Sequence, residues 1–182
     1  MRQTIAAILQ SIQPFDTLEI EHLTQTLAWI ASGAPLFRIQ KPATPPQHLV
    51  SYFVLFDSAL RKILLVDHKK AGLWLPAGGH VEPDEDPQQT VVREAEEELQ
   101  ITADFLQTTP LFLTVTETVG TGQRHVDVSL WYVLEYDSAE PLHYDKTEFH
   151  GIQWFALDQL PLERCDPHLQ RFVNKLRGTI TG

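Results

Sequence analysis

Apolar residues recur three and four positions apart in the first forty residues, which places them on one face of an α-helix. The repeat comprises Ile20, Leu23, Leu27 and Ile30. Asp16 precedes it, and Glu19 follows Asp16 by three positions, as in the capping box of a helix N-terminus. Gly33 fits the end of this helix. A shorter helix is expected over residues 4–12, so the chain should begin with a helical segment.

A proline-rich stretch separates this segment from the rest of the chain, because prolines interrupt any helix there. We therefore expect a helical extension over residues 1–40, a linker over 41–48 and a main domain over 49–178. The apolar helix face has two possible uses, which are packing on the main domain and forming a homodimer interface. Packing within the chain is favoured, because the linker is long enough to fold the helix back.

Beyond the linker, strand-like and helix-like patterns alternate. The expected strands are 49–56, 62–66, 111–118, 126–136 and 152–155, and the expected helices are 87–99 and 167–177. Asp86 can cap the first helix, Pro87 suits its first position, and Gly178 would end the second. Residues 120–122 would join the third and fourth strands. This order predicts an α+β sandwich.

Composition indicates a globular protein and limits its partners. Hydrophobic residues make up 43% of the chain, and no apolar run reaches the roughly 18 residues of a membrane span. The N-terminus has no leader-like apolar stretch, and the single cysteine, Cys165, fits a reducing compartment, so we expect a cytoplasmic location. A net charge of −10 disfavours nucleic-acid polymers. An anionic ligand would therefore need bound cations.

The expected helix over 87–99 carries an acidic stripe. At about 100° per residue, Glu94, Glu97 and Glu98 share one side, and Glu94 and Glu98 border the apolar face. That face comprises Val91, Val92, Ala95 and Leu99. The carboxylates repel one another, and Mg²⁺ would offset this repulsion while accepting phosphate oxygens. Arg93 can pair with a neighbouring carboxylate. Taken alone, such a helix is more often a solvated acidic surface.

Paired glycines ahead of the helix favour the metal-binding interpretation. Gly78 and Gly79 allow a strained turn and a close approach of the backbone to a ligand. With Glu85 and the run Arg93-Glu94-Ala95-Glu96-Glu97-Glu98, the segment from Gly79 to Ile101 resembles the Nudix box, with every fixed charged position present. Gln100 departs from the pattern, because the family usually has a glycine there that ends the helix in a left-handed conformation.

The resemblance implies a Nudix fold, an α/β/α sandwich around a mixed sheet, and metal-dependent hydrolysis of a phosphoanhydride bond. By similarity, the ligands of Mg²⁺ or Mn²⁺ would be Glu94, Glu97, Glu98 and the Gly79 carbonyl. Arg93 and Glu85 would hold the loop and the helix in register, and Glu94 or Glu98 would take the proton of the attacking water. A carboxylate outside the box sometimes serves as base or ligand in the family. Glu148 is the candidate here, with a solvated loop carboxylate as the alternative.

Substrate contacts are expected mainly from one strand. His125, Asp127, Ser129 and Trp131 share one face of the strand at its period of two. His125 and Asp127 could read a base or sugar, or could be hydrogen-bonded residues at a sheet margin. Phe53 and Trp131 could stack on a base, although core packing is favoured for both. His80 could contact a phosphate.

Several alternatives compete with this assignment. Isopentenyl diphosphate isomerase shares the fold and uses a cysteine, but Cys165 lies too late in the chain to fit. The acidic balance disfavours messenger-RNA decapping. A nucleotide-sensing or scaffold protein that has lost catalysis is the main alternative, although such proteins usually lose box carboxylates. Two small-molecule substrate classes stay open, which are nucleoside triphosphates and nucleoside diphosphates linked to a sugar, an alcohol or a second nucleoside.

Overall fold

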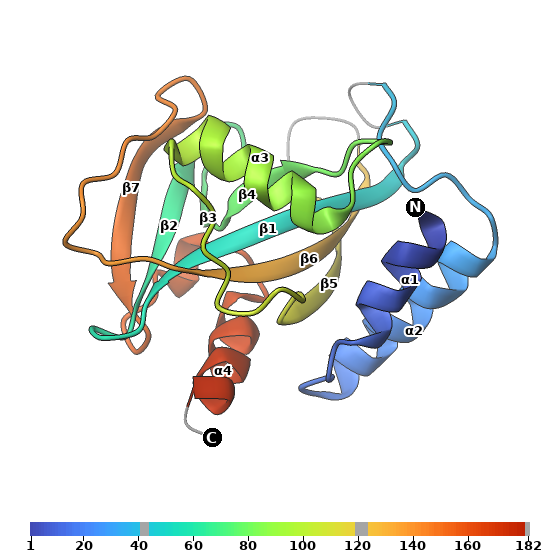
Figure 1. The fold of residues 1–182 in the computed structure, drawn as a ribbon, viewed down its shortest axis with the longest axis horizontal. Helices are drawn as coiled ribbons and strands as arrows, with labels where there is room; N and C mark the ends of the chain where they lie inside the picture. Colours follow the sequence, from blue (N-terminus) through green and yellow to red (C-terminus); the bar gives the residue numbers. More distant parts are fainter. Residues whose placement is uncertain (41–43, 119–123, 181–182) are drawn as a thin grey trace.

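The computed structural model describes residues 1–40, 44–118 and 124–180 (Figure 1). Its helices are α1 (Arg2–Gln10), α2 (Thr17–Ala31), α3 (Pro87–Leu99), the short 3-10 helix η1 (Leu162–Arg164) and α4 (Leu169–Ile180). Its strands are β1 (Gln47–Asp57), β2 (Lys62–His68), β3 (Leu73–Leu75), β4 (Ala77–His80), β5 (Phe112–Glu117), β6 (Val126–Glu135) and β7 (Phe149–Ala156). The expected connection over 120–122 and linker residues 41–43 lie outside the described residues.

The strands form one mixed sheet, as the sequence predicts. Its main path runs β3-β2-β1-β6-β5, with β4 paired to β1 and β7 paired to β2. β1 is the centre, because it pairs in parallel with β6 and antiparallel with β2 and β4. The sequence patterns missed the short strands β3 and β4. β1 also begins inside the expected linker, so residues 47 and 48 belong to the sheet.

Helices cover both faces of the sheet and close two apolar cores. In Figure 1, α3 crosses one face and α4 lies against the other. The first core takes the buried side of α3, namely Val91, Ala95 and Leu99. The second takes Phe172, Val173 and Leu176 of α4. The molecule is therefore the α/β/α sandwich expected from the sequence. Val92 departs from expectation, because it lies 47% exposed at the edge of the predicted apolar face.

The two aromatic residues considered as base-stacking platforms lie inside these cores. Phe53 is 1% exposed in the first core, and Trp131 is 0% exposed in the second. The Trp131 indole packs on Phe172, with ring centroids 5.0 Å apart, and its Nε1 donates to Thr114 Oγ1 at 3.0 Å. The polar face expected along β6 therefore does not include Trp131, because helices cover both sides of the sheet and this side chain is buried. Core packing, the favoured alternative, describes both residues.

The N-terminal helices pack on the edge of the sheet that β5 forms (Figure 1). Three residues of the predicted stripe of α2 pack on the first core, namely Leu23, Leu27 and Ile30, but Ile20 is 53% exposed. The most deeply buried side of the helix is largely polar and comprises Glu19, His22, Thr26 and Ile30. Glu19 accepts from Leu113 N at 3.1 Å and His22 Nδ1 accepts from Val115 N at 3.3 Å, so two outward amides of β5 bond to α2. Side-chain acceptors thus protect an edge strand.

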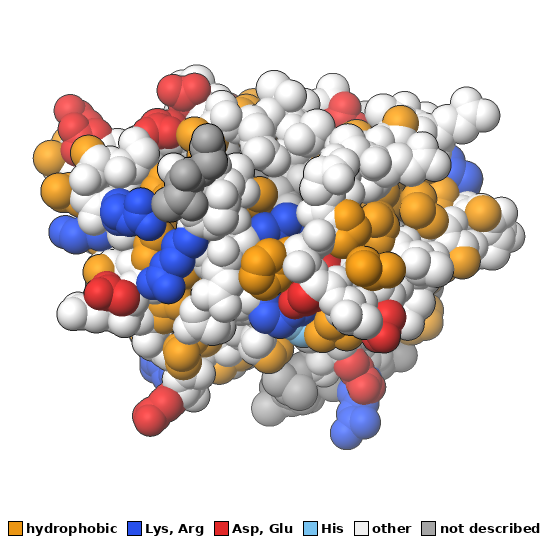
Figure 2. Space-filling view, turned by 90° about the horizontal axis from the view of Figure 1, so that it is seen from below, with side chains coloured by type: hydrophobic (Ala, Val, Ile, Leu, Met, Phe, Trp, Pro, Cys, Tyr) orange, Lys and Arg blue, Asp and Glu red, His pale blue; other side chains and the backbone are white. Residues whose placement is uncertain are grey.

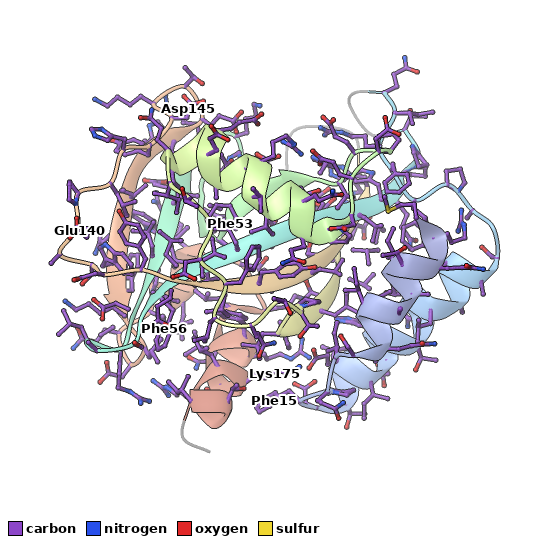
Figure 3. All side chains as sticks on the ribbon, viewed as in Figure 1. Phe15, Phe53, Phe56, Glu140, Asp145 and Lys175 are labelled. Carbon is purple, nitrogen blue, oxygen red and sulfur yellow. The ribbon has the colours of Figure 1, made fainter. Side chains whose placement is uncertain are left out.

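A buried ion pair completes this contact. Lys175 Nζ of α4 donates to both carboxylate oxygens of Glu19, at 2.8 and 3.0 Å. Phe15 N donates to Glu19 Oε2 at 2.7 Å. Figure 3 shows Phe15 and Lys175 close together between α2 and α4. The helical extension therefore packs on its own sheet, as favoured from the sequence.

The helix ends test two further expectations. Gln100 adopts the left-handed conformation, with φ 55°, that the family fills with glycine. Ile101 N then donates to Ala95 O at 3.1 Å, which satisfies the end of α3. The expectation for Gly178 was wrong, because α4 runs through it to Ile180. In the described part of the chain, no helix has both the length and the apolar character needed to cross a membrane.

Candidate active site

The paired glycines lie within β4 instead of in the expected turn, and each is confined on a different side. At Gly78, φ is 130° and an added Cβ would lie 2.1 Å from the Ser51 carbonyl oxygen of β1. At Gly79, an added Cβ would lie 2.0 Å from Glu94 Oε1. The absence of side chains therefore lets β4 lie directly between β1 and the acidic side of α3.

Local bonds fix the start of α3 at this position. The Asp86 side chain accepts from Gln88 N and Gln89 N, and Gln89 Oε1 accepts from Asp86 N at 2.9 Å, which completes a capping box. Pro87 occupies the first turn, and Ser51 Oγ donates to its carbonyl oxygen at 2.8 Å. The N-terminal end of the helix is therefore tied to β1 through Ser51, the residue that pairs with Gly79 of β4.

Arg93 organises the charged side of α3. Its Nε and Nη2 donate to the two carboxylate oxygens of Glu85 at 2.7 and 3.0 Å. Its Nη1 donates to Glu94 at 2.7 Å and to Glu97 at 3.2 Å, and its Nη2 reaches the His80 carbonyl oxygen at 3.3 Å. The paired hydrogen bonds of the guanidinium fix the orientation of Glu85. Arg93 thus joins the loop, β4 and α3, in line with its expected role.

Two of the three stripe carboxylates are withdrawn from water. Glu98 is 6% exposed and accepts from Gly78 N at 2.7 Å. Burial and the neighbouring charge of Glu94 raise the pKa of Glu98 to about 9. Burial also raises the pKa of Glu94, although Arg93 opposes this shift. The Glu97 side chain is 60% exposed. The positions of these residues around the helix predict that Glu97 is more exposed than Glu98.

The donor set fits a hard divalent cation. Two buried carboxylates repel each other, and both pKa shifts show that burial disfavours their charged forms. A cation bound to their oxygens would offset that cost. The ligating atoms of Glu94, Glu97 and Glu98 are not all within 4.8 Å of one another among the described residues. Arg93 bonds to Glu94 and Glu97, so a shared ion would require their carboxylates to turn away from the guanidinium.

Glu148, the expected carboxylate outside the box, lies on the same side of the molecule. It is half-buried, and its charge contributes to the raised pKa of both Glu94 and Glu98. Two backbone bonds hold its loop, from Asp145 N to Glu98 O at 2.8 Å and from Lys69 N to Glu148 O at 3.0 Å. The loop before β7 thus brings a further acid group towards α3.

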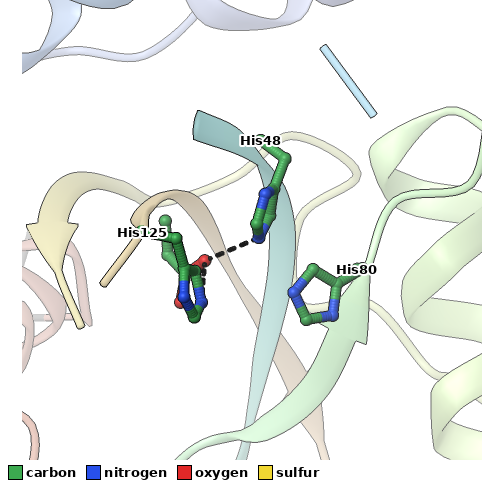
Figure 4. Close-up of side chains that lie close together, drawn as sticks. His48, His80 and His125 are labelled. Carbon is green, nitrogen blue, oxygen red and sulfur yellow. Dashed lines mark ion pairs between the residues drawn. The ribbon is translucent and has the colours of Figure 1, made fainter. Parts of the chain in front are cut away.

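The structure brings together His80, His125 and Asp127, which were expected to contact substrate, and adds His48 (Figure 4). His48 was missed because it faces Asp127 only through the parallel pairing of β1 with β6. Burial and the charge of Arg38 lower the pKa of His80 to about 3. These four residues form a cluster separate from the stripe of α3, and β4 contributes to both.

Known proteins share the domain and the fold of this chain. The NUDIX domain model matches residues 46–176. The chain is 35% identical to the CTP pyrophosphohydrolase of Escherichia coli strain K12 over 125 residues, which cover 62% of this chain and 82% of that protein. Among solved structures, a MutT NUDIX hydrolase from Burkholderia pseudomallei matches with a TM-score of 0.57 at 23% identity, covering 71% of this chain and 98% of its own.

A further solved structure extends the likeness of fold. The NUDIX domain of Shewanella oneidensis NrtR, in complex with ADP ribose, matches with a TM-score of 0.58 at 21% identity and covers 74% of this chain and 88% of its own. The family model spans the sheet, the glycines of β4 and the whole of α3. A mixed sheet between helices, a glycine strand against buried glutamates and this match together make the chain a member of the Nudix hydrolase family.

Proposed function

We propose that this protein hydrolyses a phosphoanhydride bond of a nucleotide, using Mg²⁺ or Mn²⁺ held by the acidic side of α3. The pair of Glu98, which is buried, and Glu94, whose side chain is 13% exposed beside Gly79, carries the proposal, because a bound cation stabilises carboxylates withdrawn from water. Glu97 would complete the carboxylate set and the Gly79 carbonyl would add a fourth oxygen. The bound metal would neutralise the phosphates and lower the pKa of a water.

The protein's own groups would orient this centre and move the proton. Arg93, held by Glu85, would fix the carboxylate side of the helix against β4. Glu98, held by Gly78 N, would accept a proton from the attacking water, and Glu94 or Glu148 is the alternative base. The water oxygen would form the new P–O bond as the bridging P–O bond breaks, and the leaving phosphate would carry away the negative charge.

The substrate we favour is a nucleoside triphosphate. The E. coli relative is named as a CTP pyrophosphohydrolase, and hydrolysis of that kind yields a nucleoside monophosphate and pyrophosphate. A nucleoside diphosphate linked to another group is the competing class, since the NrtR domain was solved with ADP ribose. A polymeric nucleic acid is disfavoured by the net charge of −10. On the face seen in Figure 2, basic side chains are interspersed with acidic ones and form no continuous stripe.

A panel of nucleotides with Mg²⁺ or Mn²⁺, with products identified by mass, tests the assignment. We expect CTP or a related triphosphate to give the monophosphate and pyrophosphate, and chelation to abolish turnover. Tight nucleotide binding without metal-dependent product would favour the sensor alternative. The cytoplasmic location and a homodimer stay predictions, which fractionation and sedimentation would test.

The substitution Glu98→Gln tests the centre itself. We expect turnover to fall about a hundredfold or more, because the amide can still accept from Gly78 N but has no negative charge to hold the metal and cannot take a proton. Glu96→Gln is the matched control, because Glu96 is exposed on the same helix. Turnover measured beside circular dichroism separates catalysis from folding. Full activity in Glu98→Gln would refute the assignment.

A further inference from the structure

Three histidines and an aspartate converge at one end of the sheet, apart from the acidic stripe of α3. One ligating atom from each of His48, His80, His125 and Asp127 lies within 4.8 Å of the others. His48 is the second residue of β1, Asp127 is the second residue of β6 and pairs with it, and His80 ends β4. Figure 4 shows the His80 ring facing the pair formed by His48 and His125.

Buried polar atoms in this cluster have no hydrogen-bond partner. His48 Nε2, His80 Nε2 and Asp127 Oδ1 are each buried without a hydrogen bond in the described part of the chain. The His48 side chain is fully buried and that of Asp127 is 13% exposed. Burying unsatisfied polar atoms is costly, and the 3.1 Å approach of His48 Nε2 to Asp127 Oδ1 leaves His80 Nε2 without a described partner. A cation shared by the four residues would satisfy all of these atoms.

The outer nitrogens of two rings are already engaged. His48 Nδ1 lies 2.9 Å from the Pro45 carbonyl oxygen, an arrangement in which Nδ1 donates and Nε2 keeps its lone pair. His125 Nδ1 lies 3.0 Å from Thr118 Oγ1. Oxygen partners on Nδ1 are the usual outer contacts of metal-bound histidines, because they fix the tautomer and the ring orientation. Both rings thereby turn Nε2 towards Asp127.

We propose that His48, His80, His125 and Asp127 form a second metal site, which takes Zn²⁺ in tetrahedral coordination. Bonds of about 2.0–2.1 Å in a tetrahedral zinc site separate neighbouring ligand atoms by roughly 3.3 Å. Asp127 Oδ1 lies 3.1 Å from His48 Nε2 and 3.4 Å from His125 Nε2. Three imidazoles and one carboxylate suit zinc, whereas Mg²⁺ prefers oxygen ligands throughout.

The zinc ion at this site would stabilise the fold instead of taking part in catalysis. Four protein ligands fill the coordination sphere of zinc and leave no position for substrate. The ligands come from β1, β4, β6 and the residue before β6, so the ion would hold together three strands that meet at this end of the sheet. His80 links it to the acidic centre, because its carbonyl oxygen accepts from Arg93.

The positive charge of Arg38 opposes cation binding at this cluster. Arg38 is half-buried, and its charge acts on both His80 and Asp127. Arg38→Gln should therefore tighten zinc binding, since it removes a like charge without touching a ligand. A weaker affinity in that variant would count against the proposal.

The experiment measures zinc binding directly. The full chain carrying Glu94→Gln and Glu98→Gln, which weakens the acidic centre, is stripped with a chelator and titrated with Zn²⁺ alone. We expect one ion per chain by elemental analysis after desalting. Co²⁺ in its place should give the visible absorption of a tetrahedral ion. Adding His125→Gln should weaken zinc affinity about a hundredfold or more and abolish that absorption.

Matched variants make the outcome decisive. His143→Gln and His150→Gln remove exposed histidines outside the cluster and should bind zinc as the parent does. Asp127→Asn serves as the second ligand variant if His125→Gln does not fold, which circular dichroism reports. Stoichiometry near zero in the parent, or unchanged affinity in both ligand variants, would overturn the site. A raised nucleotide KM in His125→Gln with no zinc bound by the parent would return these residues to substrate recognition.

Discussion

At the scale of single residues, the two glycines of β4 face obstacles of different kinds. Gly78 faces the backbone of β1, which cannot yield without disturbing the sheet. Gly79 faces the carboxylate of Glu94, which is the end of a flexible side chain. A methyl group at the first position therefore affects the fold, and one at the second affects the acidic centre.

We expect Gly78→Ala to cost about 2–5 kcal/mol of unfolding free energy, from both the close approach and the positive φ. Gly79→Ala should cost less than about 2 kcal/mol but lower turnover at least about tenfold, because Glu94 must move. Urea unfolding and steady-state kinetics on the same preparations check this. Equal losses of stability in the two variants would contradict it.

The helical residues of the candidate site were predictable, and the cluster at the strand ends was not. The positions of Glu97 and Glu98 follow from the angle per residue within one helix, which is local information. The left-handed conformation of Gln100 was not predicted, because residues with a Cβ rarely adopt it. His48 escaped notice because its contact with Asp127 spans nearly eighty positions and depends on strand pairing. Sequence alone does not fix which strands pair.

At the scale of elements, α2 shows why periodicity predicts a helix more reliably than its buried face. The apolar repeat located the helix, and Asp16 caps it as expected, with Glu19 N at 2.9 Å. The buried face was decided by partners far along the chain, namely Lys175 and the amides of β5. The carboxylate of Glu19 accepts from both Lys175 Nζ and Leu113 N, and Ile20 is left outside.

Removing one partner of this pair should be strongly destabilising. Lys175→Met would leave the Glu19 carboxylate buried without its cation, at a cost of about 3–5 kcal/mol. Adding Glu19→Gln should recover part of that loss, because the neutral amide can still accept from Leu113 N. Urea midpoints of the single and double variants measure the difference. A double variant less stable than Lys175→Met would contradict this account.

At the scale of the whole molecule, the N-terminal end of α2 and the last helix, α4, are joined by an ion pair. Arg171 of α4 donates to both carboxylate oxygens of Asp16, at 2.8 and 2.6 Å. These bonds hold the pKa of Asp16 at about 2, below its ordinary 3.8. A lowered folded pKa means that the stabilisation is present above the unfolded value and is lost as the pH falls through the folded one.

Asp16→Asn isolates this contribution, because asparagine keeps the N-cap and loses the ion pair. The wild type should exceed the variant in stability near neutral pH. The gap should close as the pH falls from about 4 towards about 2, where Asp16 becomes protonated. Urea midpoints across that range provide the measurement. A constant gap would mean that the ion pair contributes nothing measurable.

The hydrogen bonds from β5 to α2 also bear on where the folding unit begins. The family model starts at residue 46, yet Leu113 N and Val115 N bond to side chains near residue 20. A fragment cut at the family boundary would expose those two amides and leave Lys175 beside no acid. Such a border strand is open to pairing with another copy. We therefore expect the smallest piece of this chain that folds on its own to extend beyond the region that the family model matches and to include α2.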